Sequence, residues 1–317
     1  MMLHVLPRTA RTSSFFLSTS DLTLPVCSCC RLRHYFESFH LGVPVLGTSQ
    51  EFSHVCKRYA GLRRSLSAVA AACLGFASVE GCFSSAAQNE CDVASTHLEL
   101  AMSRAETIDI DVQACWHRVD AVLGCLLLAF LAYGRNQLKQ AEMYLRHAWR
   151  IALRPDGLAN MDSANSLDML SWQLCDVTLK RLARRVWWEL YIASSMMSHT
   201  TSGRLPNLAK ECEDQMQCKV HFPPSDLPSW DAGDSITGIR VEVVRCLTEC
   251  VQHVVDHTTG VPDIVRLDAL DCIVSNLQIR VELEWSRLSK DSVVCTQSTR
   301  QASAAICLFD AATLAHV

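Results

Sequence analysis

The chain has 317 residues, of which 49% are hydrophobic and 20% charged, so it carries enough apolar material for one large or two smaller domains. Its formal net charge of -4 argues against a protein that coats DNA or anionic membranes. The 17 cysteines are scattered through helix-like sequence, and Cys73, Cys125 and Cys307 lie inside apolar runs where a reduced cysteine acts as a small hydrophobe. These features favour a reducing compartment.

Residues 1–50 form an irregular N-terminal leader, because they lack sustained periodicity and contain several Pro and Gly breakers. Up to residue 36 the only acidic residue is Asp21. The basic side chains of the same stretch, histidine aside, are Arg8, Arg11, Arg31 and Arg33. This composition is mildly like that of a mitochondrial transit peptide, although we favour an ordinary leader.

Helical periodicity begins near residue 51 and continues through most of the chain. The pattern predicts helices over 51–79, 90–106, 112–133 and 137–153, with Gly134 closing the third. The fourth helix should end before Pro155. One apolar stripe of that helix contains Leu138, Ala141, Leu145, Ala148 and Leu153.

Two apolar runs, 66–77 and 121–133, could each form either a membrane span or a buried helix. Each is shorter than the roughly 20 residues that a bilayer requires. We therefore predict two buried helices and no membrane partner.

The segment 179–198 predicts a further amphipathic helix. Its core face contains Leu179, Leu182, Ala183, Val186, Leu190, Ala193 and Met197. Arg185 and Glu189 stand four residues apart and can form an exposed ion pair. Trp187 and Trp188 lie about 100° apart around the helix, so one should face the core and the other should cover a neighbouring helix or groove. An arginine over either ring could add a cation–π contact.

The C-terminal part predicts two more helical stretches with polar faces. His253 and His257 are four residues apart on a helix over 239–258, with Asp256 beside them, and could present two metal ligands. A half-exposed polar face explains them better. The carboxylates of 280–288 alternate with apolar residues and indicate a solvated helix surface.

These patterns predict an all-α protein, a multi-helix bundle or array behind the irregular N-terminal segment. We divide the chain into the leader 1–50, a domain over 51–230, and a C-terminal helical extension of the same domain over 231–317.

Three motifs follow one another in the middle of the chain. The first is AEMYLRHAWRIAL at 141–153, and the third is VHFPPSDLPSW at 220–230. Between them lies a helix of the type RRxWW-aliphatic-aromatic followed by Gly-Arg-Pro, here called the signature, with the residues Arg184, Arg185, Trp187, Trp188, Gly203, Arg204 and Pro206. In this order the three motifs resemble the middle homology region of fungal zinc-cluster transcription factors, the fungal transcription factor domain.

The chain departs from the family pattern at several positions. Leu205 is inserted before Pro206, and the turn after the first motif, which begins at Pro155, lacks the usual His. Ser194 and Ser195 stand where relatives usually carry an Asp-Arg pair in the signature helix.

The departure that bears most on function is the DNA-binding zinc cluster, in which six cysteines of relatives hold two metals. Cys27 and Cys30 have C-x-x-C spacing, but Glu37 stands where the next ligand should fall and the following cysteine is Cys56. A zinc site needs a complete ligand set. We therefore expect no zinc cluster, no other metal and no cofactor.

The sequence also lacks G-x-S-x-G, H-E-x-x-H, P-loop and G-x-G-x-x-G motifs, so we expect no catalytic residues. The resemblance implies a nuclear, non-enzymatic transcription regulator, in a family many of whose members control pathway or secondary-metabolite gene clusters. It would reach DNA only indirectly, through a DNA-binding partner or another transcription factor, or as a truncated factor. Self-association or association with another chain stays an open alternative. The alternative function is a helical enzyme or organellar protein with an arginine-rich leader, located in the mitochondrion.

Overall fold

The computed structural model describes residues 96, 112–162, 170–201, 203–215, 232–257 and 263–290. Within these ranges the secondary structure is helical and contains no strand, which confirms the predicted all-α class. The predictions for 1–50, 51–79 and 220–230 lie outside the described residues, and so does 90–106 apart from Thr96, which is helical.

The helices follow one another with short connections wherever the connection is described. They are α6 (Val112–Gly134), α7 (Leu138–Ala152), the 3-10 turn η3 (Leu158–Asn160), α8 (Leu170–Gln173), α9 (Val177–Thr200), α10 (Leu208–Gln215), α11 (Ala232–His257) and α12 (Ile264–Lys290).

The turn between α6 and α7 ends α6 in a way that the sequence did not predict. Gly134 is still helical, and the left-handed residue is Asn136, with φ of 58°. Asn136 N–H donates to the Tyr133 carbonyl over 2.9 Å, and Gln137 N–H donates to the Ala132 carbonyl over 2.8 Å. This is a Schellman ending, in which asparagine can replace the usual glycine. The prediction that Gly134 closes the helix is therefore wrong.

Helix α6 is also longer than the predicted apolar run 121–133. Its segment Ala114–Gly134 has 21 residues and is long and apolar enough to cross a membrane, so the prediction that this run is too short for a span is wrong. The protein itself covers this helix, since 83% of the apolar stretch is buried inside the fold. Burial between neighbouring helices accounts for its composition.

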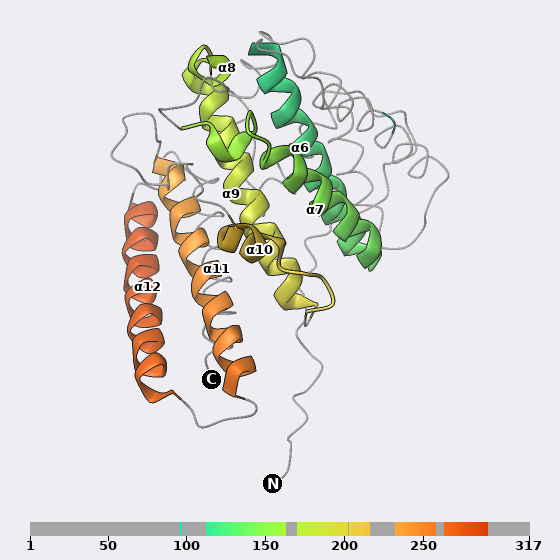
Figure 1. The fold of residues 1–317 in the computed structure, drawn as a ribbon. Helices are drawn as coiled ribbons and strands as arrows, with labels where there is room; N and C mark the ends of the chain where they lie inside the picture. The colour runs from blue at the N-terminus through green and yellow to red at the C-terminus, as the bar shows by residue number, and fades with distance from the viewer. Residues whose placement is uncertain are drawn as a thin grey trace, which may run out of the picture.

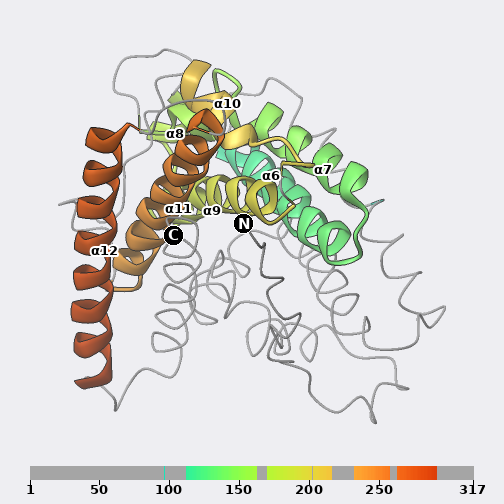
Figure 2. The ribbon, with the colours of Figure 1, turned by 90° about the horizontal axis from the view of Figure 1, so that it is seen from below.

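Helix α9 lies at the centre of the described bundle. It packs against α6 and α7 on one side and against α11 on the other, while α10 crosses near its end (Figure 1). Helices α6 and α7 lie side by side, and α12 packs on α11 at the outer edge, beyond the other helices (Figure 2). The order across the molecule is therefore α6 and α7, α9, α11, α12.

The apolar side chains gather in two clusters. The larger, here called the main core, is built from α6 to α10 and receives Val241 and Val244 from α11. It includes all the predicted core-face residues of α9, which confirms that pattern. The smaller, here called the outer core, lies between α11 and α12 and contains Ile239, Val243, Cys246, Leu247, Cys250, Leu270, Val274, Leu277 and Val281. Helix α11 thus contributes to both.

Candidate functional site

The signature residues lie on α9 and in the turn that follows it. Asp176 begins the helix as its N-cap, with its carboxylate accepting the Leu179 N–H over 2.8 Å. The first signature residue, Arg184, is buried. It makes a two-pronged contact with Asp162, with Nε to Oδ2 at 2.9 Å and Nη2 to Oδ1 at 2.5 Å. This pair fixes the loop after η3 to the middle of α9.

Trp187 joins α9 to α7. Its ring meets the ring of Trp149 edge to face, with centroids 5.3 Å apart and planes at 81°. The Trp149 indole N–H donates to Ser194 Oγ over 2.8 Å in a buried position. Ser194 thus has a defined polar role at the position where the family usually places an acid.

Trp188 points toward α11 instead. It contacts Tyr191 edge to face at 5.9 Å, and the Arg245 guanidinium lies 5.7 Å from the Trp188 ring centroid and 5.6 Å from that of Tyr191. Both tryptophans are buried, at 3% and 4% exposure. They serve different interfaces, as their spacing predicted, and an arginine of α11 supplies the cation–π contact.

Glu189 corrects a prediction. The sequence suggested an exposed pair with Arg185, but the Glu189 side chain is only 3% exposed. Its two carboxylate oxygens accept from Arg240 of α11 over 2.7 and 3.0 Å. Arg185 itself is half-buried. The periodic pattern places Glu189 on a helix face but cannot show that α11 covers that face.

The remaining signature residues shape the end of α9. Gly203 has φ of 77°, a left-handed conformation that glycine adopts readily, and its N–H donates to the Ser198 carbonyl over 3.0 Å. Arg204 is exposed, and its Nε donates to the Thr201 carbonyl over 3.3 Å. Pro206 is half-buried in the turn before α10. These residues end the helix and lead the chain into α10.

Ser195, the second unusual position, also finds a partner. Its hydroxyl donates to the Asn207 side-chain oxygen over 3.2 Å, and the same oxygen accepts the Lys210 N–H at the start of α10 over 3.2 Å. Ser195 therefore ties α9 to the beginning of α10.

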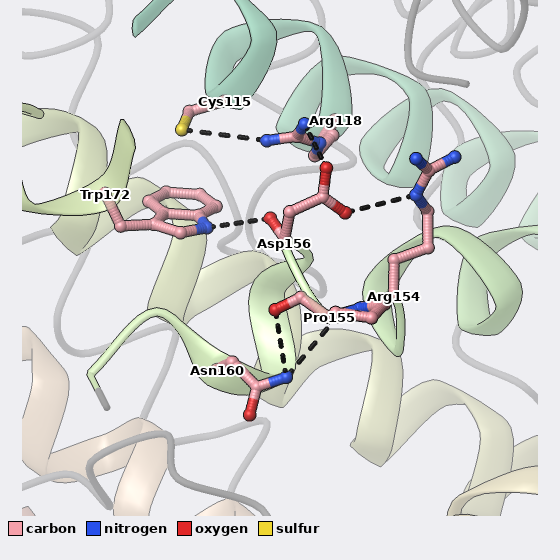
Figure 3. Close-up of polar contacts among 7 residues, drawn as sticks. All are labelled: Cys115, Arg118, Arg154, Pro155, Asp156, Asn160 and Trp172. Carbon is pink, nitrogen blue, oxygen red and sulfur yellow. Dashed lines mark hydrogen bonds and ion pairs between the residues drawn. The ribbon is translucent and has the colours of Figure 1, made fainter. Parts of the chain in front are cut away.

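A second polar cluster, around Asp156, was missed in the sequence (Figure 3). The Asp156 carboxylate forms ion pairs with the buried Arg118 of α6 and with Arg154, the latter over 3.1 Å. The Asp156 carbonyl accepts the Trp172 indole N–H over 3.0 Å, and Arg118 Nη1 approaches Cys115 Sγ at 3.9 Å. One turn thereby joins α6, α7 and α8.

Two features of the sequence could have indicated this cluster: an arginine inside an apolar helix and an aspartate before a glycine. Gly157 has to be small, because a Cβ atom there would lie 2.5 Å from the Ala152 carbonyl oxygen. Arg118 and Asp156 are 38 residues apart, so no local pattern joins them.

The buried cysteines of these helices are poor nucleophiles. Burial raises the pKa of Cys125 to about 12. The pKa of Cys175 is raised by a hydrogen bond with Cys115 and by burial, and that of Cys246 by a hydrogen bond with Cys250 and by burial. These raised pKa values keep the three thiols protonated at neutral pH, and such thiols neither attack substrates nor bind metals readily.

His199 links α9 to α11 near their ends. Its Nε2 lies 3.0 Å from Thr248 Oγ1. Burial, followed by the positive charge of Lys210, lowers the pKa of His199, so the ring is neutral in the folded protein at neutral pH. A neutral imidazole suits a structural hydrogen bond between two helices.

The histidine pair of α11 was weighed as a metal site. His253 is buried, so the predicted half-exposed face is wrong at this residue. Asp256 accepts from Gln252 over 2.6 Å and from Arg266 of α12 over 3.2 Å. The side chain of His257 is outside the described part, and within that part no three His, Cys, Asp or Glu side chains converge as a metal site would need.

No family model, no curated protein and no solved structure matches this chain. The role of the signature residues therefore follows from the contacts that they make in this fold. The signature residues do not converge on one cavity or one reacting atom. Arg184, Trp187 and Trp188 point from α9 toward three different neighbours, and Gly203 to Pro206 end the helix. Such an arrangement holds a helical framework together.

Proposed function

We propose that the chain is a non-enzymatic regulator of transcription, built on a domain that resembles the fungal transcription factor domain. Its task would be the control of a pathway-specific set of genes, for example a secondary-metabolite cluster. The observation that carries the proposal is that two of the motifs behind the resemblance, at 141–153 and 184–206, pack directly on one another.

The contact between them runs through Trp149. Its ring meets Trp187 of the signature at 5.3 Å, and its indole N–H donates to Ser194, seven residues further along the same helix. The Gly-Arg-Leu-Pro segment then ends that helix through the left-handed Gly203. The two motifs therefore form one structural unit in this fold.

The departures from the family pattern fit the same proposal. Ser194 and Ser195 each have a hydrogen-bond partner in the fold, at 2.8 and 3.2 Å. The serine pair therefore makes structural contacts of its own at about the position of the family's Asp-Arg pair. A framework role tolerates such an exchange, because it needs satisfied polar groups and not one particular charge.

Access to DNA would be indirect. The chain has a net charge of -4 and no set of six suitably spaced cysteines, so a DNA-binding partner in the nucleus would supply the sequence recognition. We expect the purified chain to give no sequence-specific gel shift at near-physiological salt. A shift that a chelator abolishes would contradict this part of the proposal.

The deciding experiment is to delete the gene, profile the transcripts, and restore the full chain at its own locus. Coordinated loss of a contiguous set of transcripts, recovered on restoration, is the expected result. If no transcript changes under any growth condition tested, the proposal is wrong.

Localisation of the full chain with a C-terminal tag separates the alternative function. Nuclear signal is expected. Import into mitochondria with removal of the leader would favour the helical organellar protein instead.

A further inference from the structure

Helix α12 carries an exposed apolar face that the described fold leaves open. Val265 is 79% exposed, Ile279 is 54% exposed and Leu283 is 65% exposed. The helix lies at the outer edge of the molecule in both ribbon views (Figures 1 and 2). Large aliphatic side chains with this exposure, repeated along one helix, mark an interaction surface.

These residues follow the spacing of a coiled coil. Steps of four and three residues alternate along one line of the helix, which is the a and d pattern of a heptad repeat. We call this line the α12 stripe, and its residues are Val265, Ala269, Cys272, Asn276, Ile279 and Leu283. All six side chains are exposed, and they provide three successive d and a pairs.

The α12 stripe is separate from the surface that holds α12 in the fold. Leu270, Val274, Leu277 and Val281 face α11 in the outer core, with the same alternation of four and three residues. At 3.6 residues per turn the two lines lie on roughly opposite sides of the helix. A partner could therefore cover the α12 stripe without displacing α11.

We propose that the α12 stripe binds the α12 stripe of a second copy of this chain, as a parallel two-stranded coiled coil. The position of Asn276 supports the choice of an identical partner. A single polar asparagine at an a position fixes register and favours two strands, because the two amides pair across the symmetry axis. In any other register Asn276 would meet an aliphatic side chain and lose that partner.

Charge on the two edges of the stripe supports the parallel orientation. Asp268 and Glu282 lie at g positions on one edge, and Arg266 and Arg280 lie at e positions on the other. In an antiparallel pair each edge would meet its own copy, acid against acid. In a parallel pair each g residue meets the e residue five positions further along the other helix. Asp268 therefore meets Ile273 and Ser275 meets Arg280, and these contacts bring no like charges together.

Arg280 keeps donors for this contact. It pairs with Glu242 of α11, yet its side chain remains 44% exposed. A guanidinium has five N–H donors, so Arg280 can also donate to the Ser275 hydroxyl of the second copy.

The inference does not rest on the proposed function, and sedimentation velocity of the full chain tests it. The α12 stripe is short, so we expect an equilibrium between monomer and dimer in the micromolar range. Ile279→Lys should abolish the dimer, because it places a charge in the seam. The control Gln278→Lys adds the same charge at an exposed neighbouring position outside the stripe and should leave the dimer intact.

Three results would overturn the proposal: a monomer at every concentration, a dimer that survives Ile279→Lys, or an assembly larger than a dimer. Circular dichroism of each variant confirms that it is folded. If Ile279→Lys fails to fold, Leu283→Lys repeats the test.

Cysteine cross-linking of the unaltered stripe tests register and direction. In a parallel pair Cys272 faces Cys272 of the other copy, so a short bismaleimide should join two chains there. Cys272→Ser should remove that covalent dimer while leaving the sedimenting dimer. A cross-link unaffected by Cys272→Ser overturns the parallel arrangement. A monomer whose Cys272 resists a simple maleimide shows that another segment covers the stripe, and it overturns the proposal as well.

Discussion

The main core and the outer core are held together by different kinds of side-chain contact. In the main core α9 is enclosed on several sides, and its neighbours meet it through tryptophan rings and buried ion pairs such as Arg184 with Asp162. In the outer core two helices meet along one line of small and aliphatic side chains. The ion pairs flanking that line, such as Arg280 with Glu242, are exposed.

The two cores owe their specificity to different kinds of contact. A helix such as α12, packed on one side only, needs one apolar line and tolerates polar surroundings elsewhere. A helix such as α9, with neighbours on both sides, buries charged residues as well, and each of these needs a particular partner. Glu189 and Arg240 are such a case, and they bind α11 to the main core.

A buried signature residue should contribute far more to the free energy of unfolding than an exposed one. Trp187→Ala should lower the free energy of unfolding by about 3–5 kcal/mol, because it removes the contact with Trp149 and leaves a cavity. Arg204→Ala, in the same signature, should change it by no more than about 0.5 kcal/mol, because the side chain is exposed. Denaturant unfolding of both variants provides the measurement. Full stability of Trp187→Ala with lost regulation would instead make the pair a docking surface.

A second contrast compares a buried ion pair with an exposed one. Glu189→Gln should cost about 3–5 kcal/mol, since it leaves the Arg240 charge buried without its counterion. Glu242→Gln removes the partner of Arg280 at the surface and should cost at most about 1 kcal/mol. Equal losses in thermal or denaturant unfolding would remove the distinction drawn between the two regions.

A third change acts within the outer core. Leu277→Ala should cost about 2 kcal/mol, the low end for a buried leucine, because the surroundings of α12 can relax toward solvent. Hydrogen exchange should show α12 losing protection while α9 keeps it. Gln278→Ala, one residue along and exposed, serves as the control. Loss of protection throughout both helices would show that the two cores unfold as one unit.

The smallest expected effect depends on pH. Burial and Lys210 lower the pKa of His199 below its ordinary 6.5, so the folded protein holds this ring neutral. Below that value the unfolded chain binds the proton more readily, and the contribution of this histidine to stability falls with pH; above it the contribution is complete. Melting temperatures of the wild type should therefore decline more steeply on acidification than those of His199→Gln. Parallel declines would contradict the shift.

The sequence predicted those features that depend on neighbours along the chain. The core faces of α7 and α9 followed from helical spacing. The placement of Glu189 failed, because its partner Arg240 is 51 residues away. The end of α6 was placed within one residue, but the residue that reverses the chain was wrong, because Asn136 and not Gly134 supplies the left-handed turn.

The Arg118–Asp156 cluster of the candidate site also could not be predicted, because its residues are far apart in the sequence. A buried arginine in α6 demands a counterion, but nothing local identifies which aspartate supplies it. Likewise, periodicity shows that Trp187 and Trp188 point in different directions, and only the folded chain shows that α7 meets one and α11 the other.

The hydrogen bond from Trp149 to Ser194 has a consequence for how this protein can evolve. Loss of the hydroxyl alone would strand a buried indole N–H, whereas loss of both groups would leave an apolar contact that costs little. Positions 149 and 194 are therefore constrained as a pair, and each sets which substitutions the other tolerates. Divergent variants of this chain should therefore change positions 149 and 194 together.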